Sequence, residues 1–452
     1  MRHTSSQAEL LCKPKDLHKF ESLFSSITMI LHTQTYLSII LTITLTGCAV
    51  YESRPIDLKT EEQAWRLTTP TQGKIKISQA EAIKTGLILN PELNKARIKL
   101  ANTEEVEKQS GWWADPSISW EMAKVLQENI LNHSGGISLS IPLTGIPALE
   151  KKLAEQYKES DYWSLKQAEL DFCTELETNW HALSITKAKK ELVQERLKSL
   201  KNETQIINKL IKVGEAEFAI GQTATERLNT ITRELQELEE TEQIQTLALL
   251  KQMGMHPDGA KHIQIISQIN YNVPRLIKAP SAGKLMQLPK IKAQMATYAT
   301  TETALKAEIR RQYPDLEIGP GFSREDDEKE VGGEFGFNIP LWNRNRQAIA
   351  EARGNRNLAH AETIQLWKET LFHVKELETS QNIISSHCKS ELSRLNDYTR
   401  TLITMEKLYK HGEIPMPELS ESRHLKYESQ VNFLTALEKL LQVRTQIIYL
   451  SK

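Results

Sequence analysis

Few side chains in this sequence stand where chemistry could be expected. The four cysteines, Cys12, Cys48, Cys173 and Cys388, are too few and too scattered for a disulfide framework or a metal ribbon. The twelve histidines show no recognised ligand spacing to cysteines or carboxylates. A nucleophile elbow, a phosphate-binding loop and a His-Glu-x-x-His sequence are also missing. These observations predict that the chain is not an enzyme and binds no metal.

Cys48 differs from the other cysteines because of what precedes it. Residues Leu37–Leu45 form an apolar stretch too short to span a bilayer. The stretch runs into Leu45-Thr46-Gly47-Cys48, which resembles the cleavage box of bacterial lipoproteins. That resemblance implies that residues 1–47 are a signal peptide and that the thiol and new amino group of Cys48 are acylated, with no other cofactor. Ala49, where an aspartate would indicate inner-membrane retention, favours the outer membrane.

The sequence offers two possible start residues for the leader, Met1 and Met29. Translation from Met1 gives an unusually long leader whose basic residues lie well before the apolar stretch. Translation from Met29 gives a leader of ordinary length without lysine or arginine. An unpaired cysteine after an apolar segment is the alternative interpretation of Cys48 itself.

The remaining candidate residues follow two glycines. Gly214 and Gly412, each preceded by helix formers, are expected at helix–helix turns that need a left-handed backbone. Glu418 and Glu421 follow Gly412 by six and nine residues, and their i,i+3 spacing places both carboxylates on one helix face. A solvated helix face is the alternative interpretation of this pair.

Composition indicates which elements position these residues. The net charge of -1 offers no basic surface for nucleic acid. Glycine (19) and proline (16) are scarce, which favours long charged helices over a sandwich of many short strands. Past residue 48 we find no run of about 18 apolar residues, so hydropathy alone indicates a soluble chain.

The sequence also repeats itself at a constant offset of 198 residues. In one register, prolines and glycines of the first half align with those of the second, and Lys209–Glu215 shares five of seven residues with Lys407–Glu413. Such agreement across helix-breaking residues indicates an internal duplication. The aligned pairs include Pro91 with Pro289, Pro116 with Pro314, Gly135 with Gly333, and Pro142 with Pro340.

Each half then shows the same order of elements. A helix of about 35 residues (Ser78–Gly111; Ala282–Tyr313) precedes two alternating segments, a very long helix (Ile146–Lys212; Asn343–Lys410), a Gly-Glu turn and a return helix. A long helix reaches roughly 100 Å, so two shorter helices stacked end to end would match its length. We divide the chain into a signal peptide (1–47), a lipidated extended segment (48–77), a first repeat (78–255), a linker (256–281) and a second repeat (282–452).

The four alternating segments predict β-strands with one apolar and one polar face. They lie near residues 117–122, 137–141, 316–322 and 334–339. A membrane β-barrel would expose the apolar face to lipid, but four strands cannot close a barrel, so several chains must contribute. The acidic segment Arg324–Glu330 is then expected as an outside loop. Burial of the apolar face against a helix is the alternative.

The repeat, the strand positions and the lipoprotein box together resemble the TolC-like outer-membrane efflux channels. Asn90-Pro91-Glu92-Leu93 and the Asn-Arg-Asn-Arg stretch 343–346 are further family-like features, the latter closest to the metal-efflux branch. The resemblance implies a mainly α fold with transmembrane β: a homotrimer in which four strands per chain build a 12-stranded barrel, continued by a helical tunnel across the periplasm of a Gram-negative bacterium.

The resemblance also assigns roles to the glycine turns and the paired carboxylates. Gly214, Glu215, Gly412 and Glu413 would form the periplasmic tips that dock an adaptor protein. Glu418 and Glu421 would be gate carboxylates, which threefold symmetry would gather around a narrow axis.

The implied function is a passive export duct for small molecules or metal ions, in a tripartite system with an adaptor and an inner-membrane pump of the RND type. The exit channel of a type I protein secretion system is an alternative of the same class. A soluble periplasmic coiled-coil adaptor or scaffold is an alternative of another class.

Overall fold

The computed structural model describes residues 51–69, 73–125, 130–266, 269–325, 328–337 and 339–451. The leader, Met29 and Cys48 lie outside them. The chain divides into two units, Met1–Glu62 and Gln63–Lys452. The segment 48–77, expected to be extended, contains a ten-residue helix, α2 (Leu58–Leu67). Asp57 accounts for this difference, because its carboxylate accepts bonds from the Lys59 amide and the Thr60 hydroxyl at the helix start.

The second unit contains one series of elements twice. The first half holds α3 (Gln79–Leu89), α4 (Pro91–Lys108), β2 (Ser117–Val125), β3 (Ile130–Ile141), α5 (Ile146–Lys212) and α6 (Phe218–Gln252). The second half holds α7 (Ala282–Leu285), α8 (Pro289–Arg310), β5 (Leu316–Glu325), β6 (Glu328–Gly336), α9 (Arg346–Lys410) and α10 (Met416–Leu450). The first residues of α6 and α10 are 198 positions apart, as are those of α4 and α8.

The opening helix of each half is broken, whereas the sequence predicted one helix of about 35 residues. The break falls at Asn90-Pro91 in the first half and at Leu288-Pro289 in the second. A residue before proline disfavours the helical backbone, and proline itself provides no amide hydrogen. Asn90 also stabilises the backbone at the break. Its Oδ1 caps α4, and its Nδ2 donates to the Gln252 carbonyl at 2.7 Å.

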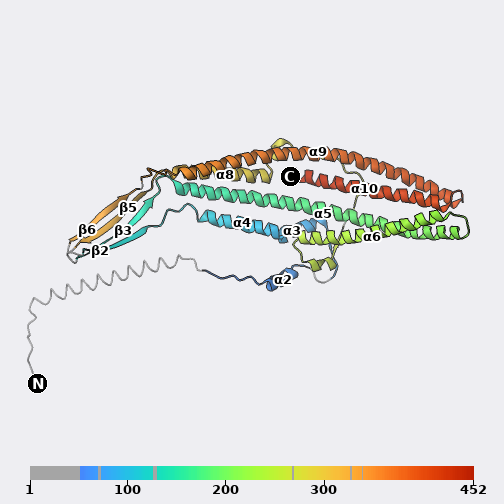
Figure 1. The fold of residues 1–452 in the computed structure, drawn as a ribbon, viewed down its shortest axis with the longest axis horizontal. Helices are drawn as coiled ribbons and strands as arrows, with labels where there is room; N and C mark the ends of the chain where they lie inside the picture. The colour runs from blue at the N-terminus through green and yellow to red at the C-terminus, as the bar shows by residue number, and fades with distance from the viewer. Residues whose placement is uncertain are drawn as a thin grey trace, which may run out of the picture. The chain divides into compact units, whose positions relative to one another are not determined.

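The two long helices are each matched by shorter helices arranged end to end, as their lengths predicted. Helix α5 (67 residues) lies along α4 and α6, and α9 (65 residues) lies along α8 and α10 (Figure 1). Contacts of α5 with α8 and α10 join the two halves. In the second unit the strands therefore extend from one end of the helical layer, and the Gly-Glu turns lie at the other (Figure 1).

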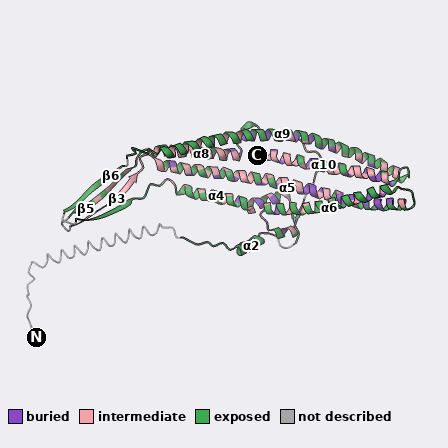
Figure 2. Cartoon of the chain, in the orientation of Figure 1, coloured by how far each residue is buried: buried purple, intermediate pink, exposed green. Residues whose placement is uncertain are grey.

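Apolar stripes along these helices form the core. Buried residues lie mainly on α5 and α10, while the strands remain largely exposed (Figure 2). One cluster joins the two halves through fully buried Ile185 of α5 and Phe433 of α10. Another lies near the turns and is built from Ile207, Met416 and Leu419. In the described part of the chain, no helix is both long and apolar enough to span a membrane.

The four strands form one antiparallel sheet in the order β2-β3-β5-β6. They run beyond the limits predicted at the hairpin ends, and the acidic segment is not simply a loop. Arg324 pairs with Lys329 and Glu325 with Glu328, so both strands continue into it. Residues 326 and 327 lie outside the described part. The predicted last strand ends three residues earlier than expected, at Gly336.

A second, smaller sheet was not expected. Strands β1 (Ile75–Ile77) and β4 (Ile263–Ile265) pair in parallel, and the 3-10 helix η1 (Pro257–Lys261) precedes β4. Regular structure thus occupies part of the expected linker 256–281. Three-residue strands that pair across almost 190 positions leave no periodic signal in the sequence.

Candidate functional site

The two glycine turns have the same geometry. Gly214 (φ +79°) and Gly412 (φ +72°) are left-handed. At the first turn, the Gly214 amide donates to the Ile211 carbonyl and the Glu215 amide to Leu210. The second turn repeats these two bonds, from Gly412 to Tyr409 and from Glu413 to Leu408. This pattern is a Schellman motif, which needs a residue free of the Cβ penalty at the left-handed position.

The turns themselves are exposed to solvent. The side chains of Glu215 and Glu413 are exposed, and a Cβ atom built on either glycine would meet nothing within 4 Å. Space for a contacting protein is therefore available at both turns. A β-branched residue at either glycine would nevertheless be strained, because of the backbone conformation rather than crowding.

The two candidate gate carboxylates have different surroundings. Glu418 is exposed and makes no ion pair within the described residues. Glu421 is half-buried, and its Oε2 accepts a hydrogen bond from Arg227 Nη2 of α6 at 2.6 Å. Glu421 therefore connects the two helical hairpins, whereas Glu418 does not.

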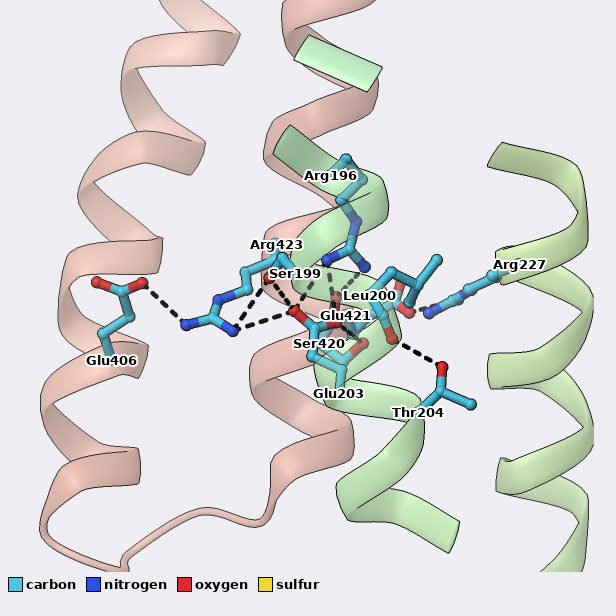
Figure 3. Close-up of polar contacts among 10 residues, drawn as sticks. All are labelled: Arg196, Ser199, Leu200, Glu203, Thr204, Arg227, Glu406, Ser420, Glu421 and Arg423. Carbon is cyan, nitrogen blue, oxygen red and sulfur yellow. Dashed lines mark hydrogen bonds and ion pairs between the residues drawn. The ribbon is translucent and has the colours of Figure 1, made fainter. Parts of the chain in front are cut away.

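Beside Glu421 lies a buried ionic network that the sequence analysis did not identify (Figure 3). Arg196 and Glu203 of α5 are 4% and 2% exposed at their side chains. Arg196 Nη1 donates to both carboxylate oxygens of Glu203, at 3.0 and 2.9 Å. The Glu203 carboxylate also accepts bonds from the hydroxyls of Ser199 and Ser420, each at 2.6 Å.

The network extends from α5 across α10 to α9. Arg423 of α10 donates through Nη1 to Glu203 Oε1 at 3.0 Å and through Nη2 to Glu406 Oε1 at 3.3 Å (Figure 3). Arg196 Nη2 donates to the Ser420 carbonyl at 3.3 Å. With the Arg227–Glu421 bond, the first turns of α10 are thus tied to α5, α6 and α9.

The polar bonds keep Glu203 ionised despite its burial. Burial alone raises the pKa of Glu203, but the hydrogen bonds from Ser199 and Ser420 and the charge of Arg196 outweigh it and lower the pKa below 4.5. Burial also lowers the pKa of the Arg196 guanidinium, although that group remains charged.

Part of this network had a signal in the sequence. Arg196 and Glu203 are seven residues apart and therefore share a helix face, as an opposite-charge pair on a long helix. Their contact with Ser420 and Arg423 links residues more than 200 positions apart, which no local pattern indicates.

The second candidate region is the four-stranded sheet, whose two faces differ in charge. On the apolar face, the rings of Trp120 and Phe322 meet edge to face at 5.4 Å between centroids. On the polar face, Ser323 donates to Glu330 and Asn132 to Glu325. Every acidic side chain of the described strands lies on that polar face: Glu121, Glu317, Glu325, Glu328, Glu330 and Glu334.

Metal-ligating side chains do not converge in the described residues, where no group of three histidine, cysteine or carboxylate side chains could hold an ion. Cys173 and Cys388 form no disulfide within the described residues. The Cys388 side chain is fully buried among apolar residues, which raises its pKa to about 11.

No protein-family model and no curated protein matches this sequence. Solved structures do match the fold. The outer membrane protein VceC from Vibrio cholerae is 15% identical with a TM-score of 0.69, over 82% of this chain and 96% of VceC. The CmeC outer membrane channel of Campylobacter jejuni is 15% identical with a TM-score of 0.68, over 90% of this chain and 93% of CmeC.

A third structure, CusC, described in terms of transmembrane channel formation, is 13% identical with a TM-score of 0.68, over 89% of this chain and 97% of CusC. Identities this low establish similarity of fold. The chain therefore has the fold of the TolC-like outer-membrane channels, and the mainly α fold with four strands per chain that the sequence predicted is confirmed.

Proposed function

We propose that this chain is one subunit of an outer-membrane export channel. The observation that carries the proposal is the four-stranded sheet, with an exposed apolar face and an acidic polar face, at one end of two long helical hairpins. Apolar side chains toward lipid and polar ones toward a lumen are the pattern of membrane barrels. Four strands cannot close a barrel, so three chains would supply 12 strands and the helices would continue the duct through the periplasm.

Aromatic residues at the strand–helix junction support insertion of the sheet into a membrane. Trp112 and Trp113 precede β2, Tyr313 precedes β5, and Trp342 follows β6. All four are strongly exposed, from 55% to 89%. Tryptophan and tyrosine are enriched where a membrane surface meets water, so these residues would mark the periplasmic boundary of the bilayer.

The lipid anchor at Cys48 is compatible with the dimensions of the second unit. Trp65 is fixed there, because its Nε1 donates to the Gly254 carbonyl at 2.8 Å. The chain from Cys48 to Trp65 reaches up to about 45 Å if residues 48–57 are extended. Helix α4, which starts beside Gly254, covers about 27 Å toward β2. The tether is therefore long enough to reach the bilayer. Palmitate labelling that persists in Cys48→Ala would exclude the anchor.

The glycine turns are proposed to dock an adaptor that connects the channel to an inner-membrane pump of the RND type. Both turns are exposed and structurally equivalent, as a repeated docking element requires. Gly214→Val and Gly412→Val should weaken cross-linking to the adaptor while trimers still form. Unchanged cross-linking and transport in both variants would argue against docking at these turns.

The gate is proposed at the ionic network and the candidate carboxylates Glu418 and Glu421. Partner contacts would open it by shifting α10 between two packings, with exchange of its bonds to α5, α6 and α9. The variant with Glu418→Ala and Glu421→Ala should change single-channel conductance and block by divalent cations. If both properties stay at the wild-type values, the gate lies elsewhere.

The substrate is proposed to be a small molecule or metal ion. The polar face of the described strands carries six glutamates and no lysine or arginine, and acidic rings favour cations. Deleting the gene should raise sensitivity to compounds in a panel of metal salts and drugs, and the compounds affected would identify the substrate. Sensitivity restored equally by an unrelated porin would refute specific export.

The decisive experiment is reconstitution of the purified full chain. We expect heat-modifiable, detergent-dependent trimers on gels and discrete conductance steps in planar bilayers. Glu330→Gln and Glu334→Gln together should reduce selectivity for potassium over chloride. A monomer in detergent that produces no conductance steps would refute the proposal and favour a periplasmic scaffold.

A further inference from the structure

The strand register separates the charges of the sheet by sign. On the face that carries Trp120, Phe322 and Val331, the described residues include no acidic side chain. This apolar face does carry four basic side chains, all near the hairpin ends: Lys124, His133, Arg324 and Lys329. All the glutamates lie on the opposite face. Alternation of apolar and polar residues does not by itself require this separation.

Three of these basic residues form one row across the sheet. His133 of β3 lies opposite Arg324 of β5, which in turn lies opposite Lys329 of β6. On β2, Met122 lies opposite His133, and Lys124 lies two residues beyond Met122 toward the hairpin end. Lys124 and Lys329 make no ion pair within the described residues.

The row borders the apolar surface. Trp120, Phe322 and Val331 lie two residues closer to the helices than Met122, Arg324 and Lys329, respectively. Trp120 also contacts the His133 ring, at 6.1 Å between centroids. From Leu316 to Arg324 the strand covers about 27 Å, or about 20 Å perpendicular to a membrane at a tilt of ~40°. Membrane barrels carry an apolar band of ~25 Å, so Arg324 would lie near the outer edge of that band, where a charged side chain costs little.

We propose that Lys124, His133, Arg324 and Lys329 form a phosphate-binding rim for the lipids of the outer leaflet. The inference rests on the proposed channel function, which places the apolar face in the bilayer and the hairpins outside. An apolar surface continuous with a basic border matches a phosphorylated lipid, whose chains and headgroup are similarly arranged. A soluble polyanion would match the basic row but not the apolar surface below it.

The test measures lipid preference of the purified full-length protein in detergent. The probes are bis-phosphorylated lipid A and the same lipid A after removal of both phosphates, and the bound lipid is quantified by native mass spectrometry. The wild type should prefer the phosphorylated form. Each cation near a lipid surface contributes about 1 kcal/mol, or about fivefold in binding. The variant with Lys124→Gln, Arg324→Gln and Lys329→Gln should therefore lose roughly a hundredfold of that preference.

Glu330→Gln is the matched control, because Glu330 is adjacent to Lys329 but on the opposite face. It should keep the wild-type preference. If the triple variant does not fold, Lys329→Gln alone should lower the preference about fivefold. Equal binding of both lipids by the wild type, an unchanged preference in the lysine and arginine variants, or an equal loss in Glu330→Gln would each overturn the inference.

The channel proposal is tested separately, by conductance of the wild type in bilayers of neutral phosphatidylcholine. A wild type that conducts there but binds both forms of lipid A equally would support the channel function and refute the phosphate-binding rim. A wild type that prefers phosphorylated lipid but never conducts would support the phosphate-binding rim and refute the proposed channel function.

Discussion

Replacing Glu203 with alanine should destabilise the first turns of α10 more than any exposed ion pair could. Glu203 is 2% exposed at its side chain and accepts bonds from Arg196, Ser199, Ser420 and Arg423. Its removal leaves two guanidinium groups without their shared carboxylate, and one of these groups is buried. Breaking a buried ion pair in this way costs about 3–5 kcal/mol.

Hydrogen exchange is the appropriate assay, because the opening is local and the assembled protein does not unfold in a single two-state step. A loss of 3 kcal/mol corresponds to a factor of about 150 in an opening equilibrium, since 1.4 kcal/mol is tenfold. Amide exchange in the first turns of α10 should therefore accelerate by about two orders of magnitude in Glu203→Ala. Exchange in α4, outside the network, should not change.

An exposed pair provides the control. Lys375 and Glu378 of α9 are 75% and 41% exposed, so Glu378→Ala should cost less than about 1 kcal/mol. The double variant Arg196→Met with Glu203→Leu should recover much of the loss, because apolar residues replace buried ion pairs at little cost. If Glu203→Ala accelerates exchange no more than Glu378→Ala does, the network does not hold α10 in place.

Three further predictions concern pH and backbone geometry. Hydrogen bonds hold the pKa of Glu203 below its ordinary value in the folded state, so its contribution is complete at a pH above the pKa of the unfolded group and is lost as the pH falls through the folded pKa. Protection of α10 should fall in that acidic range, except in Glu203→Gln. Arg344 has φ +47°, so Arg344→Gly should raise the thermal transition by relieving about 1 kcal/mol. Gly319→Ala should destabilise the sheet by about 1–3 kcal/mol and lower the trimer yield on gels, because its Cβ would overlap the Ile137 carbonyl oxygen. Gly332→Ala has open space around it and should leave the trimer yield unchanged.

Much of the fold could be predicted because its signals are local. Alternation over a few residues indicates a strand, and the same glycine and glutamate at the same offset indicate two equivalent turns. The constant offset of 198 residues then showed that strands and helices recur in one order. The prolines at 91 and 289 match across this offset, and each breaks its helix because the residue before proline leaves the helical backbone.

The amino-acid sequence by itself determined which elements form and which face of each is apolar, since these depend on neighbours within a few residues. Tertiary structure alone decided which elements meet. The pairing of Arg324 with His133 depends on a register between strands nearly 200 residues apart, and Glu203 meets Arg423 only because α10 packs on α5. Charges at such separations interact through space, so their partners emerge only when the chain is folded.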